Sequence, residues 1–167
     1  HLYLSRGVKF EIPPISEDFV FKQLKGLDSN KATGTDNVSA KLIKLSASVI
    51  FQPIAKILNT SIGTGKFPTK WKTARVAPIY KAGSKSDKNN YRPISVLCSL
   101  SKILERHVHE AFYKYLTDNN LLHNAQSGFR ASHSCETALT RLVNMWTTNM
   151  DKRLLNGIVL LDLRKAF

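Results

Sequence analysis

One carboxylate near the end of the chain is the residue best suited to catalysis. Asp162 interrupts an apolar run, since residues 158–161 and Leu163 are all apolar. A charge at the tip of a buried strand is costly unless a cation balances it. Mg²⁺ prefers hard oxygen ligands, usually one or two carboxylates together with substrate phosphates. The pattern therefore favours Asp162 as one member of a metal site for phosphoryl transfer, and the alternative is an Asp that caps a following turn.

The segment around Arg92 is suited to binding phosphate. Pro93 fixes the backbone that follows Arg92 and biases Arg92 itself toward an extended conformation. A guanidinium held in this way can bind a phosphate through two parallel hydrogen bonds. Arg75 and Lys81 are an even number of residues apart, so on a strand they share a face. Together these residues favour a triphosphate clamp on a hairpin, and the alternative is a solvent-exposed arginine before a turn.

A short loop at residues 126–130 combines groups that can contact a nucleic-acid strand. Gly128 stands beside Phe129 and Arg130 there. A glycine lets a polynucleotide come close to the backbone, while the ring and the guanidinium can stack on bases. The alternative is an ordinary turn that packs Phe129 into the core, and the residues alone do not separate the two.

A second loop, residues 31–36, resembles a phosphate-binding loop only superficially. It lacks the glycine spacing and the Gly-Lys-Ser/Thr ending of a P-loop. Lys31 remains a candidate for contact with a phosphate backbone. A helix–helix turn capped by Asp36 is the alternative, and it explains the composition at least as well.

The chain carries a large excess of basic residues. Its 167 residues include 25 Lys and Arg against 12 Asp and Glu, a formal net charge of +13. Such an excess favours a polyanionic partner, usually nucleic acid, and the alternative is a basic surface that only aids solubility. No heptad or repeat indicates a structural or interaction protein.

Composition also indicates the cellular compartment in which we expect the protein. Two cysteines, Cys98 and Cys135, do not suggest a disulfide framework, so we expect a reducing compartment, nuclear and/or cytoplasmic. The longest purely apolar runs are about four residues, far short of a helix that spans a bilayer, so we expect no membrane partner. No positive flank leads into an apolar run with a cleavage site, as it would in a signal peptide.

Apolar periodicity and turn residues predict a helix-rich chain with a few strands. A helix is expected to begin at Ser16, and two more are expected within 38–62, with the second starting at Pro53. Further helices are expected over about 101–118, capped by Ser99 or Ser101, and over about 135–150. Strands near 74–80 and 93–97 are expected to pair as a hairpin, and a last strand is expected after residues 156–157, an Asn-Gly turn.

Taken in order, six segments resemble the front part of a reverse transcriptase of the non-long-terminal-repeat retrotransposon type. Each is modest alone, whereas their order and spacing are specific, and they cover residues 16–167 approximately. The segments are 31–37 (KATGTDN), 67–81 (FPTKWKTARVAPIYK), 90–97 (NYRPISVL), 101–106 (SKILER), 126–130 (QSGFR) and 161–167 (LDLRKAF).

The resemblance implies an α+β, helix-rich fold that corresponds to the fingers subdomain of a right-hand polymerase, with a basic β-hairpin and the first palm strand. Its divisions are an extended leader over 1–15, the fingers part over 16–156 and the first palm strand over 157–167. In the family another Asp follows the position of Phe167, and a Tyr-x-Asp-Asp motif comes later. Because the chain also begins at His1 rather than Met, we expect a truncated fragment.

The resemblance also assigns roles to residues. Asp162 corresponds to the first catalytic, metal-binding aspartate of the palm, one ligand of a site for two Mg²⁺ ions. Lys81 and Arg92 correspond to residues that contact the triphosphate of the incoming dNTP. The residues that would lie along the RNA template and the DNA primer are Lys31, Gly34, Gln126, Gly128, Phe129 and Arg130.

The expected function is therefore that of a fragment of an RNA-directed DNA polymerase, a nucleotidyltransferase, that binds template, primer and dNTP. A single carboxylate cannot hold two metal ions, so we expect this fragment to be inactive alone. The alternative is a non-catalytic basic module that binds nucleic acid, or the relic of a decayed retrotransposon.

Overall fold

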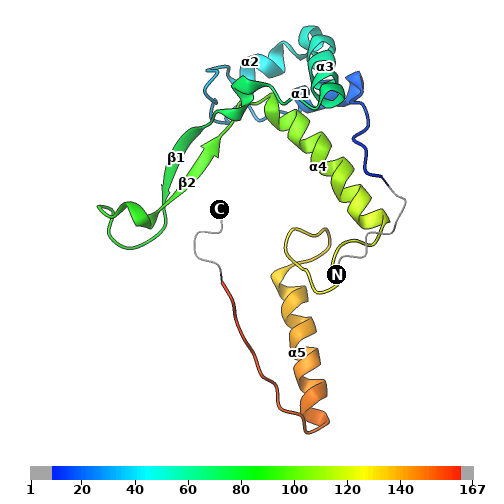
Figure 1. Cartoon of the computed structure of the whole chain (residues 1–167). Coiled ribbons are helices and arrows are strands. Elements are labelled where there is room, and N and C mark those ends of the chain that lie inside the picture. The colour runs from blue at the N-terminus through cyan, green and yellow to red at the C-terminus, as the bar shows by residue number, and fades with distance from the viewer. Residues whose placement is uncertain (1–8, 163–167) are drawn as a thin grey trace. The chain divides into compact units, whose positions relative to one another are not determined.

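The computed structural model describes residues 9–162, which belong to two compact units, one over residues 1–119 and one over 120–167 (Figure 1). The first unit contains α1 (Glu17–Lys25), α2 (Ala40–Leu45), α3 (Ala47–Thr64), η1 (Thr69–Lys72), β1 (Arg75–Tyr80), η2 (Lys88–Asn90), β2 (Tyr91–Val96) and α4 (Ser101–Asp118). The second contains α5 (Cys135–Asp151). The expectation of a helix-rich α+β chain is confirmed. Within the described part, no helix is long and apolar enough to span a bilayer.

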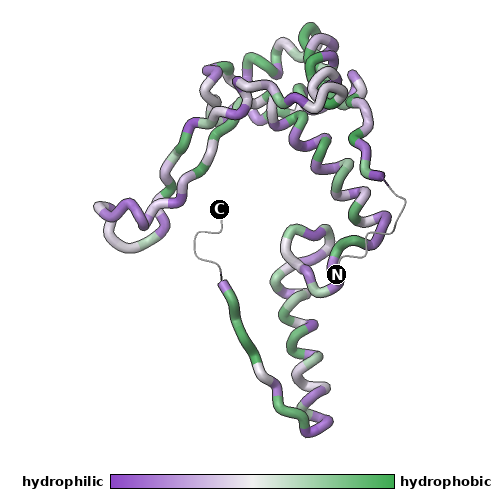
Figure 2. Tube along the Cα trace, viewed as in Figure 1, coloured by the Kyte–Doolittle hydropathy of each residue, from purple (hydrophilic) through white to green (hydrophobic). Residues whose placement is uncertain are grey.

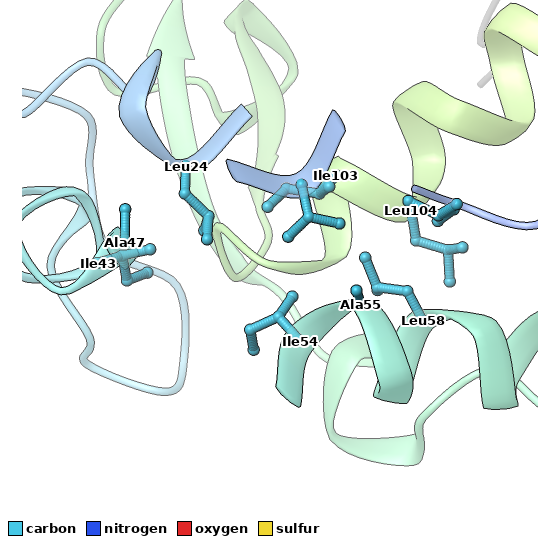
Figure 3. Packing of buried hydrophobic residues seen from close by; sticks show 10 residues of the cluster. Leu24, Ile43, Ala47, Ile54, Ala55, Leu58, Ile103 and Leu104 are labelled. Atoms are coloured by element: carbon cyan, nitrogen blue, oxygen red, sulfur yellow. The ribbon is translucent and has the colours of Figure 1, made fainter. Parts of the chain in front are cut away.

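The core of the first unit lies between α1, α3 and α4 (Figure 3). Leu24 of α1 and Leu58 of α3 are fully buried, and Leu104 of α4 is nearly so. Burying one such side chain contributes about 1.5–3 kcal/mol. Helix α1 starts where the sequence predicts, because the Ser16 hydroxyl accepts a hydrogen bond from the Phe19 amide at 3.1 Å. The buried residues of the cluster are Ile15, Val20, Leu24, Ile43, Ala47, Ile54, Ala55, Leu58, Ile103 and Leu104.

The segment that leads into α1 has no helix or strand between residues 9 and 16, yet it is anchored to the helices. The amide of Ile15 donates to Asn59 Oδ1 at 2.7 Å, and Asn59 Nδ2 donates to the Ile15 carbonyl at 2.9 Å. His107 Nε2 lies 2.7 Å from the Pro13 carbonyl oxygen. The Ile15 side chain is buried, so this segment closes one side of the core.

The division between α2 and α3 falls at Ser46, and the predicted division at Pro53 is wrong. The Ser46 hydroxyl donates to the Leu42 carbonyl at 2.9 Å and so satisfies a group at the end of α2. Pro53 lies inside α3, where its ring nitrogen cannot donate to the Val49 carbonyl. Both residues lie on an exposed side of the helix, with Val49 77% exposed, so water can reach this site. Solvent access therefore makes the proline tolerable there.

Helix α4 has the bounds that the sequence predicts, but its start differs from the expectation. Leu100 occupies the capping position, and no side chain caps the helix. Ser101 is buried, and its hydroxyl donates to the Cys98 carbonyl at 3.0 Å. The predicted cap by Ser99 or Ser101 is therefore wrong, because the packing of the β2–α4 connection directs the Ser101 hydroxyl to a backbone carbonyl.

The two predicted strands pair as an antiparallel hairpin, β1 with β2, which Figure 1 shows extending from the helices of the first unit. Pro78 lies opposite Pro93 in the register. Prolines have no amide hydrogen, so a ladder accepts them at positions that need no donor. Both faces of the hairpin are exposed, with Val76 59% and Ile79 50% exposed. A lone hairpin is only marginally stable in water, so these faces are candidates for binding a partner.

In the second unit, α5 begins with a capping box. The Ser134 hydroxyl accepts from the Thr137 amide at 3.1 Å, and Thr137 Oγ1 accepts from the Ser134 amide at 2.9 Å. No residue of α5 is buried, although Leu139, Leu142 and Val143 form the predicted apolar face. Local capping and periodicity therefore define this helix.

The strand predicted after residues 156–157 is not formed in the described residues 157–162, which have no regular secondary structure. Figure 2 shows this stretch as largely hydrophobic, and Leu160 and Leu161 are almost fully exposed. A strand needs the backbone donors and acceptors of a neighbouring strand, and the one sheet of the described residues is the β1–β2 hairpin. Residues 163–167 of the predicted strand lie outside the described part.

Candidate functional site

The hairpin register puts Lys81 and Arg92 on one face. Arg92 lies opposite Ile79, and the Lys81 amide donates to the Asn90 carbonyl at 2.8 Å, which extends the ladder by one position. Lys81 and Arg92 are therefore diagonal neighbours, a relationship that separates two residues by about 7–8 Å. Both side chains are exposed. Two cations at this spacing can contact different phosphates of one polyphosphate.

Arg75 belongs to the same face, but its side chain is occupied. Its guanidinium Nη2 donates to Asn37 Oδ1 at 3.1 Å. Asn37 adopts a left-handed backbone conformation with φ of 56°, which Asn tolerates better than most residues. Arg75 therefore ties the base of the hairpin to the loop of residues 31–37, while Lys81 and Arg92 lie toward the other end of the strands.

The loop of residues 31–37 contacts the connection that directly follows β2. Gly34 is buried, and a Cβ at this position would lie 2.6 Å from the Cys98 nitrogen and 2.8 Å from the Leu97 carbonyl carbon. A second link is the hydrogen bond shared by the hydroxyls of Thr35 and Thr73 at 3.1 Å. Gly34 is thus required by close packing, since any side chain would displace the loop from the hairpin.

The other predicted residues of that loop have distinct surroundings. Lys31 is exposed, and its amide donates to the Asp28 carbonyl at 3.2 Å in a turn. Asp36 Oδ1 accepts from the Val38 amide at 3.3 Å and so holds a turn. The cap of α2 is Ser39, whose hydroxyl accepts from the Leu42 amide, so the alternative in which Asp36 caps the helix is wrong.

The loop of residues 126–130 exposes its aromatic ring. Phe129 is 97% exposed and has φ of 59°, a conformation that is costly for a bulky residue. The alternative that packs Phe129 into the core is therefore wrong. Gly128 has open space where a side chain would stand, and Gln126 Nε2 donates to the Gly128 carbonyl at 3.1 Å. The ring and the open backbone beside it are available for stacking.

Arg130 holds this loop together from within. Its Nη1 donates to the His123 carbonyl at 3.2 Å and to the Gln126 carbonyl at 3.4 Å. These bonds orient the guanidinium toward its own loop. The structure thus gives Arg130 a supporting position beside Phe129.

Asp162 is exposed and lies in a stretch without regular structure. Among residues 9–162, no group of three or more His, Cys, Asp and Glu side chains could hold a metal ion. Two-metal catalysis needs more than one carboxylate, so the described residues do not by themselves fit a two-Mg²⁺ site.

The sequence expectations did not include the opposite face of the hairpin, where a concavity lies. Tyr80 and Tyr91 directly precede Lys81 and Arg92 in the sequence. Because neighbouring residues of a strand point to opposite faces, this pairing of an aromatic and a basic residue on both strands was the available signal.

Comparisons with known proteins identify the family of the chain. Residues 79–167 match the family model for reverse transcriptase (RNA-dependent DNA polymerase). The chain is 31% identical over 157 residues to a probable RNA-directed DNA polymerase from transposon BS of Drosophila melanogaster, covering 93% of this chain and 17% of that protein. It is 30% identical over 168 residues to the RNA-directed DNA polymerase from mobile element jockey of the same species, and this match covers 99% of this chain and 18% of that protein.

A more distant relative is similar over a shorter stretch. The retrovirus-related Pol polyprotein from type-1 retrotransposable element R2 of Popillia japonica is 30% identical over 103 residues, which cover 62% of this chain and 14% of that protein. The chain thus spans less than a fifth of the length of these curated relatives. The family match begins within β1 and includes Lys81, Arg92, Phe129 and Asp162. Since that match covers more than half of the chain and the relatives extend it over nearly the whole length, the chain belongs to the reverse transcriptase family, of the non-long-terminal-repeat retrotransposon type.

Proposed function

We propose that this chain is the part of an RNA-directed DNA polymerase that binds the dNTP triphosphate, the RNA template and the DNA primer. The observation that carries the proposal is the shared, exposed hairpin face of Lys81 and Arg92. Lys81 supplies a compact positive charge, and Arg92 supplies a planar guanidinium that can form two parallel hydrogen bonds. Together they suit a chain of phosphates. We assign the hairpin and the helices that support it to the fingers subdomain.

The template and primer would follow the two loops. Lys31 provides an exposed charge beside Gly34, whose packing anchors the loop to the hairpin. Phe129 provides an exposed ring for stacking, and Gly128 leaves the backbone beside it accessible. Gln126 and Arg130 support this ring through hydrogen bonds within the loop.

Asp162 would contribute one oxygen ligand to the Mg²⁺ ions of the complete polymerase. A divalent ion there would neutralise charge that develops on the transferred phosphoryl group. The further carboxylates that such a site needs would come from residues outside 9–162. Within this chain the role of Asp162 is to present a carboxylate at the end of an apolar stretch.

We also propose that the protein acts in a reducing compartment, nuclear and/or cytoplasmic. Cys98 and Cys135 are both free thiols, and Cys135 is exposed. An exposed free thiol fits a compartment in which thiols stay reduced.

The experiment that tests the triphosphate role is a binding titration with a fluorescent dNTP. Lys81→Ala and Arg92→Ala should each weaken binding by about 10-fold or more, the usual effect of losing a charge-assisted hydrogen bond. Lys41→Ala on α2 removes one equally exposed charge away from the hairpin and should change binding little. Equal affinities for all three variants and the wild type would overturn the assignment.

A further inference from the structure

The concavity on the hairpin lies on the face opposite Lys81 and Arg92. Its volume is about 530 Å³, within the usual range of small-molecule sites, about 300–1,000 Å³. Side chains alternate between the two faces of a strand, so Pro78 and Tyr91 point to the face opposite that of Lys81 and Arg92. The residues that line it are Pro78, Lys85, Ser86, Lys88, Asn89, Tyr91 and Pro93.

The strand side of the concavity is made of rings. Pro78 lies opposite Pro93 across the ladder, and Tyr91 follows on the same face. The Tyr91 ring is held by Tyr80, with ring centres 5.7 Å apart and an angle of 61° between the planes. The aromatic ring of Tyr91 can stack on a nucleobase, and the two proline rings extend the apolar surface beside it.

The loop side of the concavity is basic and polar. Lys85 and Lys88 line it together with Ser86 and Asn89. The Lys85 Nζ lies 5.7 Å from the centre of the Tyr80 ring, so this charge stays close to the aromatic pair. A base on the rings would therefore have cations beside its flanking phosphates.

One acidic residue belongs to the same loop. Asp87 Oδ1 accepts hydrogen bonds from the Asn89 amide at 2.9 Å and from Asn89 Nδ2 at 3.0 Å. Asp87 does not line the concavity. The net charge of the loop side is therefore positive, because it has two lysines and one carboxylate, and the carboxylate is already hydrogen-bonded within the loop.

The loop is organised before any ligand binds. The Tyr91 hydroxyl donates to the Lys85 carbonyl at 2.8 Å, and the Tyr80 hydroxyl donates to the Gly83 carbonyl. Asn90 Nδ2 donates to the Ser84 carbonyl at 2.9 Å. These bonds fix the position of the lysine backbone, so little ordering is left to be done when a ligand binds.

We propose that this concavity binds one nucleotide of a single-stranded nucleic acid, with the base on the Pro78–Pro93–Tyr91 rings and the flanking phosphates on Lys85 and Lys88. The proposal rests on the proposed function only in taking nucleic acid as the partner. A duplex does not fit, because its bases stack on one another and offer no free face. The hairpin would then hold a strand on one face and a triphosphate on the other.

The test uses the 167-residue chain and a single-stranded oligonucleotide that carries 2-aminopurine, whose fluorescence falls when its base stacks. Lys85→Ala with Lys88→Ala should reduce the slope of log affinity against log salt by about 1.4, since each phosphate contact on a single strand adds about 0.7. That change corresponds to about 25-fold weaker binding at 0.1 M salt. The control removes the same charge on α2 and α3, Lys41→Ala with Lys56→Ala, and should have a clearly smaller effect.

A separate set of variants tests whether the base stacks on Tyr91. Tyr91→Phe keeps the ring and loses the hydrogen bond to the Lys85 carbonyl, so it should keep the fluorescence change at saturation, whereas Tyr91→Ala should weaken binding by about 5- to 100-fold. Because Tyr91→Ala also removes the contact with Tyr80, a strand carrying 5-iodouracil is cross-linked to the wild type as well. Cross-links at Tyr91 or Tyr80 would support the proposal, and cross-links confined to other parts of the chain would overturn it.

Two further comparisons separate this inference from the proposed function. If Lys81→Ala with Arg92→Ala abolishes dNTP binding and keeps strand binding, both stand. If the Lys85 and Lys88 variant binds the strand like the wild type, or if a duplex binds better than a single strand, this inference is wrong while the triphosphate role is untouched. Titrations with an RNA and a DNA oligonucleotide of the same sequence show which of the two nucleic acids the concavity prefers. Quenching of 2-aminopurine that depends on Lys85 and Lys88, with either oligonucleotide, supports the site.

Discussion

The backbone of Gly34 lies against the backbone of Cys98. A Cβ on residue 34 would stand 2.6 Å from the Cys98 nitrogen and 2.8 Å from its Cα, closer than real Cβ atoms approach such atoms. The contact joins the loop of residues 31–37 to the connection that directly follows β2, so the position of Lys31 relative to the hairpin depends on it. A residue predicted to lie along nucleic acid thus has a structural role that accounts for its identity.

Replacing Gly34 by Ala should destabilise the first unit. Overpacking against backbone atoms that cannot rotate away costs about 1–3 kcal/mol. Gly63→Ala is the matched control, because no atom lies within 4 Å of its Cβ position in α3. It should raise the free energy of unfolding by up to about 1 kcal/mol. Urea unfolding measures both, and equal effects for the two variants would contradict the packing argument.

The paired hydrogen bonds between Asn59 and Ile15 should contribute measurably to stability. Asn59→Ala leaves the amide and the carbonyl of Ile15 without these partners, which costs about 1–3 kcal/mol in a partly buried position. Gln52→Ala removes only an exposed hydrogen bond to Glu17 and should stay within about 0.5 kcal/mol of the wild type. Thermal unfolding that fails to separate the two variants would show that the segment before α1 is not anchored.

The chain should bind nucleic acid mainly through phosphates. If it neutralises about 4–6 of them, log affinity should fall with log salt with a slope of about −3 to −5. Fluorescence anisotropy with labelled strands of different base composition measures the slope and the base preference. We expect similar affinities for the different compositions, and a slope near zero would exclude the phosphate contacts.

The 167-residue polypeptide should not extend a primer, even with Mg²⁺. Asp162 is a single carboxylate, and a two-metal mechanism needs further ligands. A primer-extension assay with labelled dNTPs measures this directly, and an active reverse transcriptase serves as the positive control. Templated incorporation by the purified polypeptide would show that the active site is complete without further residues.

Arg92 should matter for nucleotide use in a longer polypeptide that includes the remaining carboxylates of the polymerase. Arg92→Ala should lower kcat/KM for the dNTP by about 30- to 1,000-fold, the effect of losing about 2–4 kcal/mol of contact in the transition state. Arg92→Lys should restore this only in part, because a point charge cannot form two parallel hydrogen bonds.

The control for that prediction is Arg6→Ala, outside the motifs, which should leave the kinetics unchanged. Circular dichroism must confirm that each variant is folded, since a misfolded variant would lose activity for another reason. Wild-type kinetics in a folded Arg92→Ala variant would rule out the triphosphate role.

The sequence by itself determined the family and most of the local structure. Ser16 caps its helix where it was expected to, and α4 has the predicted bounds. The hairpin was also predictable, because two apolar strands with a polar connection can pair only with each other nearby. These features depend on hydrogen bonds and side-chain periodicity within a few residues, and a short window of sequence contains that information.

Only the tertiary structure decided which groups meet across long distances in the chain. Packing placed Gly34 against Cys98 and directed the Arg75 guanidinium to Asn37. It also moved the division between α2 and α3 to Ser46, since an exposed side of α3 tolerates Pro53. Such outcomes depend on the register of strands, on solvent access and on the close approach of separate elements. None of these is contained in the residue types of one segment, because each arises from how several segments pack together.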